Sequence, residues 1–400
     1  MTATEPKRPR VPRGLARDGA ALWSYGFRPF FLGAGVWAVA AMALWIAALV
    51  HGLPLGGAYG APLWHAHEMV FGFAPAVLAG FLLTAIPNWT GGLPVSGRPL
   101  MALAGLWALG RLAMAGAALI GPVPAALADM AFLPALLAIA AREIIAGRKW
   151  KDLKVLAAVA AIAAGNTGFH AAFFLGGDPA LWLRAGVAGY VALIMVIGGR
   201  IVPSFTRNWL AQRGATALPV AYNRFDMGVT AFGAAVLALW CIAPDAALLL
   251  PAALVAAGLH AQRLARWRGL ATRAEPLLFV LHAAYGLVVL GLLAIAAAAA
   301  GLILPASALH VLTVGAIAAM MLAVMTRATR GHTGRALSAS RLTALSYLCL
   351  FAAALARPLA DVTGLFGLME VAGLLWIAAF GLFTAEHAPM LLFRRRELRG

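Results

Sequence analysis

Apolar stretches of roughly the length that crosses a bilayer, about 20 residues, follow one another along almost the whole chain. Short polar breaks, or breaks that contain Gly and Pro, separate them. The pattern predicts twelve membrane-spanning helices, and therefore an all-α, polytopic membrane helix bundle. The predicted spans are Phe30–Val50, Leu63–Ala85, Pro99–Leu119, Val123–Ala141, Val155–Leu175, Trp182–Val202, Met227–Ala243, Ala246–Leu264, Pro276–Ala299, Leu304–Thr326, Leu342–Ala356 and Val362–Ala385.

The composition agrees with a lipid environment. Hydrophobic residues make up 63% of the 400 residues, and only 11% are charged, against about 25% in soluble domains. No linker divides the chain, so we expect a basic N-terminal tail (1–28), one transmembrane domain (29–387) and a basic C-terminal tail (388–400). The first span is long enough to be retained as a helix. Cys241 and Cys349 lie in apolar spans, which excludes a disulfide framework.

The net charge of +17 does not indicate a nucleic-acid partner, because Lys and Arg recur in every second loop instead of forming one basic face. The two tails and the alternate loops hold twenty-eight of these residues, whereas the remaining loops hold only Arg184 and Arg357. Basic loops face the cytoplasm in membrane proteins. Both termini are therefore expected on the cytoplasmic side.

Four histidines are predicted to lie at one depth in the outer half of the membrane. His65 and His67 lie near the outer end of the second span, His170 near that of the fifth and His310 near that of the tenth. Ionisable groups are costly inside a bilayer and are by default candidates for function. Imidazole is a common ligand of transition metals and haem iron. These four residues are therefore candidate metal ligands, with hydrogen-bonded packing and a proton relay as the alternatives.

Residues two apart lie about 200° apart around a helix, so His65 and His67 are expected to serve different partners. Hydrogen bonds to the second imidazole nitrogen orient a metal-binding histidine. Glu68, Asn166 and Thr313 are candidates for this role.

Further charged residues are predicted inside the spans. Arg111 and Asp129 fall at comparable depths, which favours an ion pair between helices. The alternative is that Arg111 holds an anionic group such as a haem propionate. Glu370 is a candidate for a proton pathway or an unrecognised pair.

On the cytoplasmic side, only His282 is expected to be embedded in the bundle, and we include it with Arg111, Asn166 and Glu68 as a candidate cofactor-binding residue. His260, His332 and His387 are expected to be interfacial, and Arg200 is expected to extend to the surface.

At these same positions the sequence resembles the NnrS family of bacterial membrane proteins. The Trp-His-Ala-His-Glu-Met run and the Gly-His-Thr-Gly-Arg run are the specific matches. The matching stretches cover nearly the whole chain in order: Arg28–Leu32, Trp64–Gly72, Gly80–Gly91, Asn166 with Phe169–His170, Gly199–Pro203, His310 with Thr313–Gly315, Met325–Arg327 and Gly331–Arg335.

The resemblance implies a multi-pass inner-membrane protein that carries haem b and copper and is linked to nitric oxide metabolism, nitrosative stress and denitrification. The adjacent His-His pair of haem-copper oxidases is missing, so oxygen reduction is not expected. Our leading hypothesis is a site near the periplasmic face in which His65, His67, His170 and His310 bind haem and copper. Nitric oxide would be the small-molecule ligand, and an electron donor would be a possible partner. The alternative is a proton-coupled secondary transporter of a metal or anion, without haem. The sequence assigns no reaction.

Overall fold

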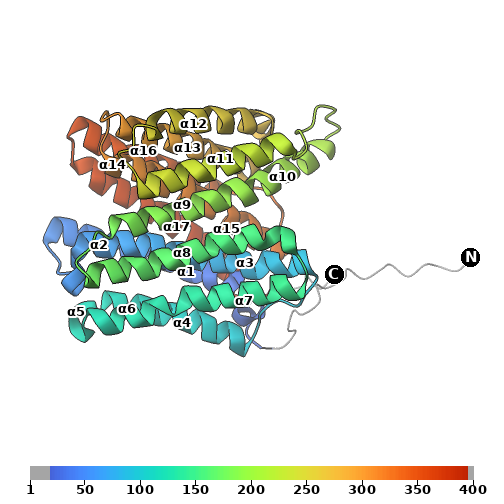
Figure 1. The fold of residues 1–400 in the computed structure, drawn as a ribbon. Helices are drawn as coiled ribbons and strands as arrows, with labels where there is room; N and C mark the ends of the chain where they lie inside the picture. The colour runs from blue at the N-terminus through green and yellow to red at the C-terminus, as the bar shows by residue number, and fades with distance from the viewer. Residues whose placement is uncertain (1–18, 395–400) are drawn as a thin grey trace, which may run out of the picture.

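The computed structural model describes residues 19–394, and within this range it contains helices but no strand (Figure 1). Most of the predicted basic tails, residues 1–18 and 395–400, lies outside the described residues. The α-helices are α1 (Phe27–His51), α2 (Gly60–His67), α3 (Ala74–Thr90), α4 (Arg98–Ala115), α5 (Ala117–Ile120), α6 (Pro122–Met130), α7 (Phe132–Ala146), α8 (Leu153–Phe174), α9 (Ala180–Leu193), α10 (Gly199–Ala211), α11 (Arg224–Ile242), α12 (Leu249–Ala265), α13 (Pro276–Ala299), α14 (Pro305–His310), α15 (Ala319–His332), α16 (Arg341–Thr363) and α17 (Gly367–Leu392).

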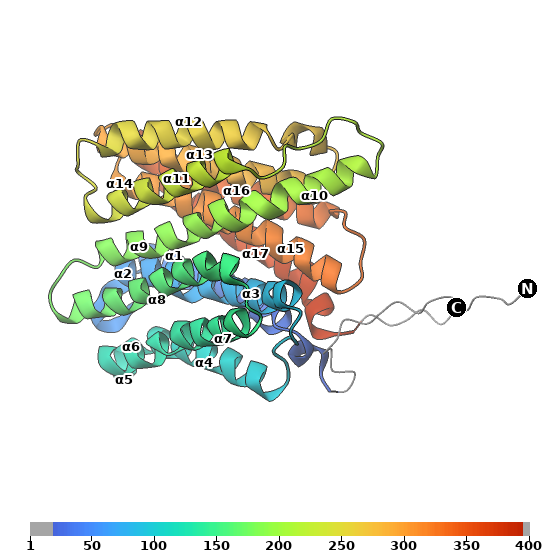
Figure 2. The ribbon, with the colours of Figure 1, turned by 45° about the vertical axis from the view of Figure 1, so that its right-hand side comes forward.

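The long helices run side by side along a common direction. In both views α11 and α12 lie at one edge of the bundle and α4 at the opposite edge (Figures 1 and 2). Between these edges, α1 packs against α3 and α17, and α8 packs against α9. Many leucines and isoleucines project from the bundle, including Leu119 at 90% exposure and Ile242 at 76%. Such an apolar outer surface fits lipid rather than water as the surroundings.

Helices occupy all twelve predicted spans. Within the described residues, ten helical segments have the length and hydropathy to cross a membrane, which confirms the polytopic helical bundle. The third predicted span corresponds to α4 with α5, and the eighth to the shorter apolar helix α12. Twelve crossings therefore remain a prediction, although the helices lie where the hydropathy pattern placed them.

Several predicted boundaries differ from the structure, and two of the helices continue through a proline. The sixth span continues past Pro203 to Ala211, so the following loop is shorter than expected. Proline in a helix interior removes a backbone donor, and a π-helix (Ile194–Gly198) lies directly before α10. Similarly, α16 continues through Pro358 and ends where Gly364 adopts a left-handed conformation with φ of 71°.

Three of the membrane spans contain a π-helix. These are η3 (Glu68–Phe73) between α2 and α3, η5 (Ile194–Gly198) between α9 and α10, and η7 (Val311–Ala318) between α14 and α15. They fall in the second, sixth and tenth predicted spans, four spans apart. A π-helix bulges out of the regular ladder and is frequent at functional sites. His65 and His310 each lie shortly before one of these π-helices.

The two ends of the described chain meet at one end of the bundle. Arg28 lies inside α1, not in a tail, and its guanidinium donates to the carbonyl oxygens of Met390 and Leu391 at 3.0 and 2.9 Å. These carbonyls belong to the last turn of α17, where a cation satisfies groups that have no partner within the helix. The start of α1 and the end of α17 therefore lie at the same end of the bundle. An even number of membrane crossings requires this arrangement.

Candidate functional site

Six polar side chains form a buried cluster, which we call the polar cluster, among the second to fifth spans. They come from the α2–η3 junction, α4, α6 and α8, and each is at most 3% exposed. Its members are His67, Glu68, Arg111, Asp129, Asn166 and His170. Buried charges are stable only when paired and hydrogen-bonded, so the way these groups meet decides what the cluster can do.

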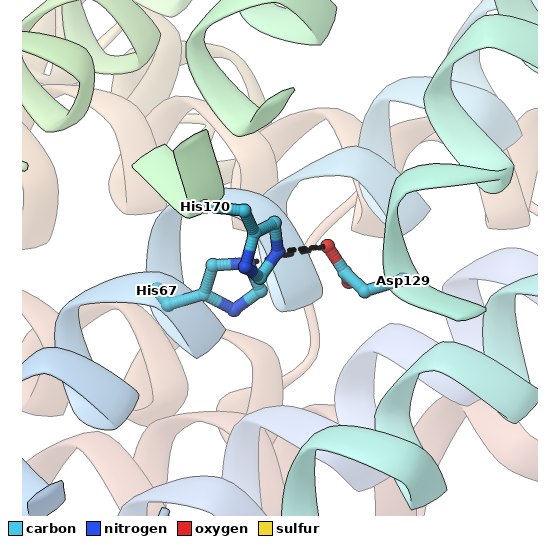
Figure 3. A group of neighbouring side chains, drawn as sticks. All are labelled: His67, Asp129 and His170. Atoms are coloured by element: carbon cyan, nitrogen blue, oxygen red, sulfur yellow. Dashed lines mark hydrogen bonds and ion pairs between the residues drawn. The ribbon is translucent and has the colours of Figure 1, made fainter. Parts of the chain in front are cut away.

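Two imidazoles of the polar cluster converge on one carboxylate oxygen. His67 Nε2 lies 3.2 Å from Asp129 Oδ2, and His170 Nε2 lies 3.1 Å from the same atom. Figure 3 shows both rings turned toward Asp129. One ligand atom from each of the three residues lies within 4.8 Å of the other two. Two imidazole nitrogens and a carboxylate oxygen at this separation can hold a transition-metal ion.

The other nitrogen of each imidazole is held in place by a neighbouring side chain. His67 Nδ1 lies 3.0 Å from Glu68 Oε1, and His170 Nδ1 lies 2.8 Å from the hydroxyl of Tyr59. Partners of this kind fix the tautomer and direction of metal-binding imidazoles. Glu68 lies where its predicted orienting role requires, whereas Asn166 Oδ1 lies 3.0 Å from His67 Nε2, the nitrogen that faces Asp129, and so does not hold the far nitrogen of the ring.

Arg111 links the two carboxylates of the polar cluster. Its guanidinium donates to Glu68 Oε2 and to Asp129 Oδ1. The predicted ion pair between Arg111 and Asp129 is therefore present, and Glu68 is an additional partner. Asp129 is at once the partner of Arg111 and a candidate metal ligand. Sequence reasoning gave it only the first of these roles.

Gly72 on η3 leaves room for the Arg111–Glu68 ion pair. A Cβ atom at this position would overlap Arg111 Nη1 and lie 2.6 Å from Glu68 Oε2. The backbone oxygen of Gly72 also accepts a hydrogen bond of 2.9 Å from Trp107 Nε1. The Gly that ends the Trp64–Gly72 motif is thus required by a close approach of side chains.

His65 and His310 do not join the polar cluster but line a separate cavity of about 280 Å³. His65 stacks on Trp45 with ring centroids 4.5 Å apart, and its Nδ1 is buried without a hydrogen-bond partner. His310 Nδ1 donates to the carbonyl oxygen of Ala306 at 2.7 Å, which leaves Nε2 free to act as a ligand. The rest of the lining is largely apolar, apart from Thr313, Tyr190 and Arg357.

A second, smaller cavity of about 80 Å³ shares one lining residue, Tyr190, with the larger cavity. The Tyr190 hydroxyl is buried and has no partner. All three π-helices line this pair of cavities: η3 and η7 contribute to the larger one and η5 to the smaller one. Neither π-helices nor cavities leave a hydropathy signal, so sequence analysis could not locate them.

The histidines predicted to lie on the cytoplasmic side are apart from both sites. His282 Nε2 lies 2.7 Å from the Thr206 hydroxyl. The expectation that His260 and His387 are interfacial is wrong, because both are fully buried. His260 Nδ1 lies 2.8 Å from the Tyr285 hydroxyl. The charged residues beside these histidines had suggested the surface, but the arginine at position 263 is itself buried and ion-paired.

The structure also gives the positions of Glu370, Arg200 and His332, for which the sequence analysis made predictions. Glu370 is exposed in the first turn of α17 and is therefore not a buried pathway carboxylate. The side chain of Arg200 is 38% exposed, as expected for a residue that extends to the surface, and it also reaches Asp152 at 3.0 Å. His332, predicted to be interfacial, is exposed.

Comparison with known proteins now adds to this geometry. No protein among those with curated functions matches the chain. The sequence does match the family described as NnrS protein over residues 21–395, a range that includes the polar cluster and both cavities. The chain therefore belongs to the NnrS family.

Proposed function

We propose that this protein binds haem b and copper in the bacterial inner membrane and acts in nitric oxide metabolism or protection against nitrosative stress. The observation that carries the proposal is the separation of the four outer histidines into two sites. His67 and His170 meet at Asp129, and His65 and His310 line the larger cavity.

The polar cluster suits copper. His67 Nε2, His170 Nε2 and Asp129 Oδ2 would be the ligands, and imidazole nitrogens are common ligands of copper. Glu68 and Tyr59 hold the far nitrogens of the two rings; in the tautomers with a proton on each Nδ1, both Nε2 atoms would face Asp129 Oδ2 as ligands. This arrangement of orienting partners is typical of metal-binding histidines.

The larger cavity suits haem b. His65 and His310 come from two different helices and present ring nitrogens to an apolar space within the bundle. Arg357 lines the same cavity and could hold a propionate, although its Nη1 also lies 2.9 Å from Asp361. Arg111, for which a propionate role was an alternative, has both of its carboxylate partners in the polar cluster. Arg357 is thus better placed for that role.

Haem iron and copper both bind nitric oxide, which supplies the chemistry that the proposal requires. Nitric oxide is small and uncharged, so it can reach a site inside the membrane without a polar channel. The protein's own residues would orient the metal ligands, keep water away and balance charge. A redox cycle would also need an electron donor.

The deciding experiment is a visible absorption spectrum with metal analysis on the full chain purified in detergent. We expect a Soret band and bound copper. Protein that inserts and folds but carries neither would overturn the proposal and favour the proton-coupled transporter. Reconstitution with haem and copper before the measurement guards against loss during purification.

A further inference from the structure

The charges of the polar cluster do not cancel when its imidazoles act as ligands. Metal ligation requires both imidazoles to be neutral. Glu68 and Asp129 then contribute two negative charges and Arg111 one positive charge. No other ion pair of the described residues 19–394 reaches either carboxylate through a Lys or Arg. One negative charge is left for the bound ion to balance.

The surroundings make this balance important. All six members of the polar cluster are at most 3% exposed, and the rings of Phe71 and Phe169 lie against His67 at centroid distances of 5.5 and 5.0 Å. An uncompensated charge in such a place is expensive because water cannot solvate it. A monovalent cation would make the cluster neutral. A divalent cation would leave one positive charge unless a second anion entered.

The number of ligand atoms also favours a monovalent cation. His67, His170 and Asp129 offer three atoms. Zinc with three protein ligands usually completes its shell with water or substrate in an open position. Monovalent copper accepts two or three ligands and needs no water. The remaining polar neighbour, Asn166, already donates to Asp129 Oδ2 at 2.8 Å and has its Oδ1 3.0 Å from His67 Nε2, so it is not a free fourth ligand.

We infer that Arg111 sets the charge of the ion that this cluster accepts: the site selects a monovalent soft cation, copper in its +1 state, over divalent ions. The inference rests on the proposed copper site and adds the oxidation state and the residue that determines it. Removal of the Arg111 charge would leave two negative charges, and the preference would shift toward a divalent ion. Arg111 is a positioning and selectivity residue, because it does not touch the metal ligand Nε2 atoms.

The test is a competition between silver(I) and zinc(II) for the purified full chain, with bound metal measured after removal of free ions. Silver(I) is monovalent and soft and is not redox-active under these conditions. Wild-type protein is expected to retain silver in the presence of equal zinc. In Arg111→Gln, the zinc-to-silver ratio is expected to rise by about tenfold or more. Arg200→Gln, which changes an ion-paired arginine outside the polar cluster and both cavities, is the control and should leave the ratio unchanged.

Glu68→Gln removes one negative charge from the polar cluster, whereas Arg111→Gln removes a positive one. Because Glu68 supplies no metal-ligand atom, the zinc-to-silver ratio of this variant should be lower than that of the wild type. Preference of the wild type for zinc, or equal ratios in wild type, Arg111→Gln and Glu68→Gln, would overturn the inference and leave the copper site standing. The wild-type competition decides the question even if a variant does not fold. Wild-type protein that binds neither ion at the cluster would overturn the copper site together with this inference.

Discussion

His65 and His67 lie two residues apart on α2 but face different sites: His65 lines the larger cavity, and His67 lies 3.2 Å from Asp129. Single alanine substitutions should therefore remove different groups. We expect His65→Ala to lose haem and keep copper. His67→Ala should lower copper occupancy by more than about tenfold, since even loss of an outer partner has that effect, and should keep haem. The Soret absorbance and metal analysis measure both.

The same experiment extends to the other histidine of each site. His310→Ala should behave like His65→Ala, and His170→Ala like His67→Ala. His51→Ala, at the exposed C-terminal end of α1, is the control and should change neither content. Normal haem and copper in all four site variants would show that these histidines serve packing or proton transfer.

The division between the two histidines of α2 could be predicted from the helical period, whereas the common membrane depth of the four histidines stays a prediction. The sequence could not show which helices are neighbours. For this reason His170 was not paired with His67, and the metal-ligand role of Asp129 was missed. The buried hydroxyl of Tyr190 and the second bond of Arg111 to Glu68 also depend on packing between distant spans. Such contacts have no local signal in one sequence.

Gly72→Ala should disturb the polar cluster by steric overlap alone. The new methyl group would overlap Arg111 Nη1 and press on Glu68 Oε2, so the guanidinium must move away from at least one carboxylate. Overpacking of a filled interior costs about 1–3 kcal/mol. We expect lower thermal stability in detergent, together with reduced copper occupancy because Asp129 and Glu68 lose their fixed positions.

Gly105→Ala is the matched control for this substitution. Gly105 lies on α4, the helix that also carries Arg111, but a Cβ atom there would meet nothing within 4 Å. Alanine favours a helix over glycine by about 1 kcal/mol. The thermal stability of Gly105→Ala should therefore equal that of the wild type or be slightly higher. Equal losses in both variants would indicate a general effect on helix packing and not an effect on the polar cluster.

Arg111→Leu should destabilise the protein strongly, because it leaves Glu68 and Asp129 as buried carboxylates without their cation. Breaking a buried pair in this way costs about 3–5 kcal/mol. Adding Asp129→Leu should restore only part of the stability, since Glu68 would still lack its cation. Full recovery in the double variant, measured by thermal unfolding in detergent, would show that the Arg111–Glu68 contact contributes nothing.

Tyr59→Phe removes the hydroxyl that lies 2.8 Å from His170 Nδ1 but leaves the ring stacked on Phe173. The bundle should fold normally, whereas copper affinity should fall by about 10- to 100-fold, as for other outer partners of metal-binding histidines. Tyr222→Phe, at an exposed tyrosine of the loop before α11, is the control. Unchanged copper affinity in Tyr59→Phe would argue against His170 as a ligand.

The last prediction concerns orientation in the membrane, on which the periplasmic placement of both sites depends. The connections between α8 and α9 and between α11 and α12 lie at the end of the bundle opposite to the start of α1 and the end of α17 (Figures 1 and 2). Basic residues concentrate in the tails and in the loops at the end of the bundle where α1 starts and α17 ends. This distribution predicts that this end is cytoplasmic. Reporter fusions after Asp178 and Asp245 should therefore read periplasmic. Fusions after Lys151, Arg213 and Arg268 should read cytoplasmic. The reverse pattern would move His67, His170 and the larger cavity to the cytoplasmic half, and a mixed pattern would contradict the helix order itself.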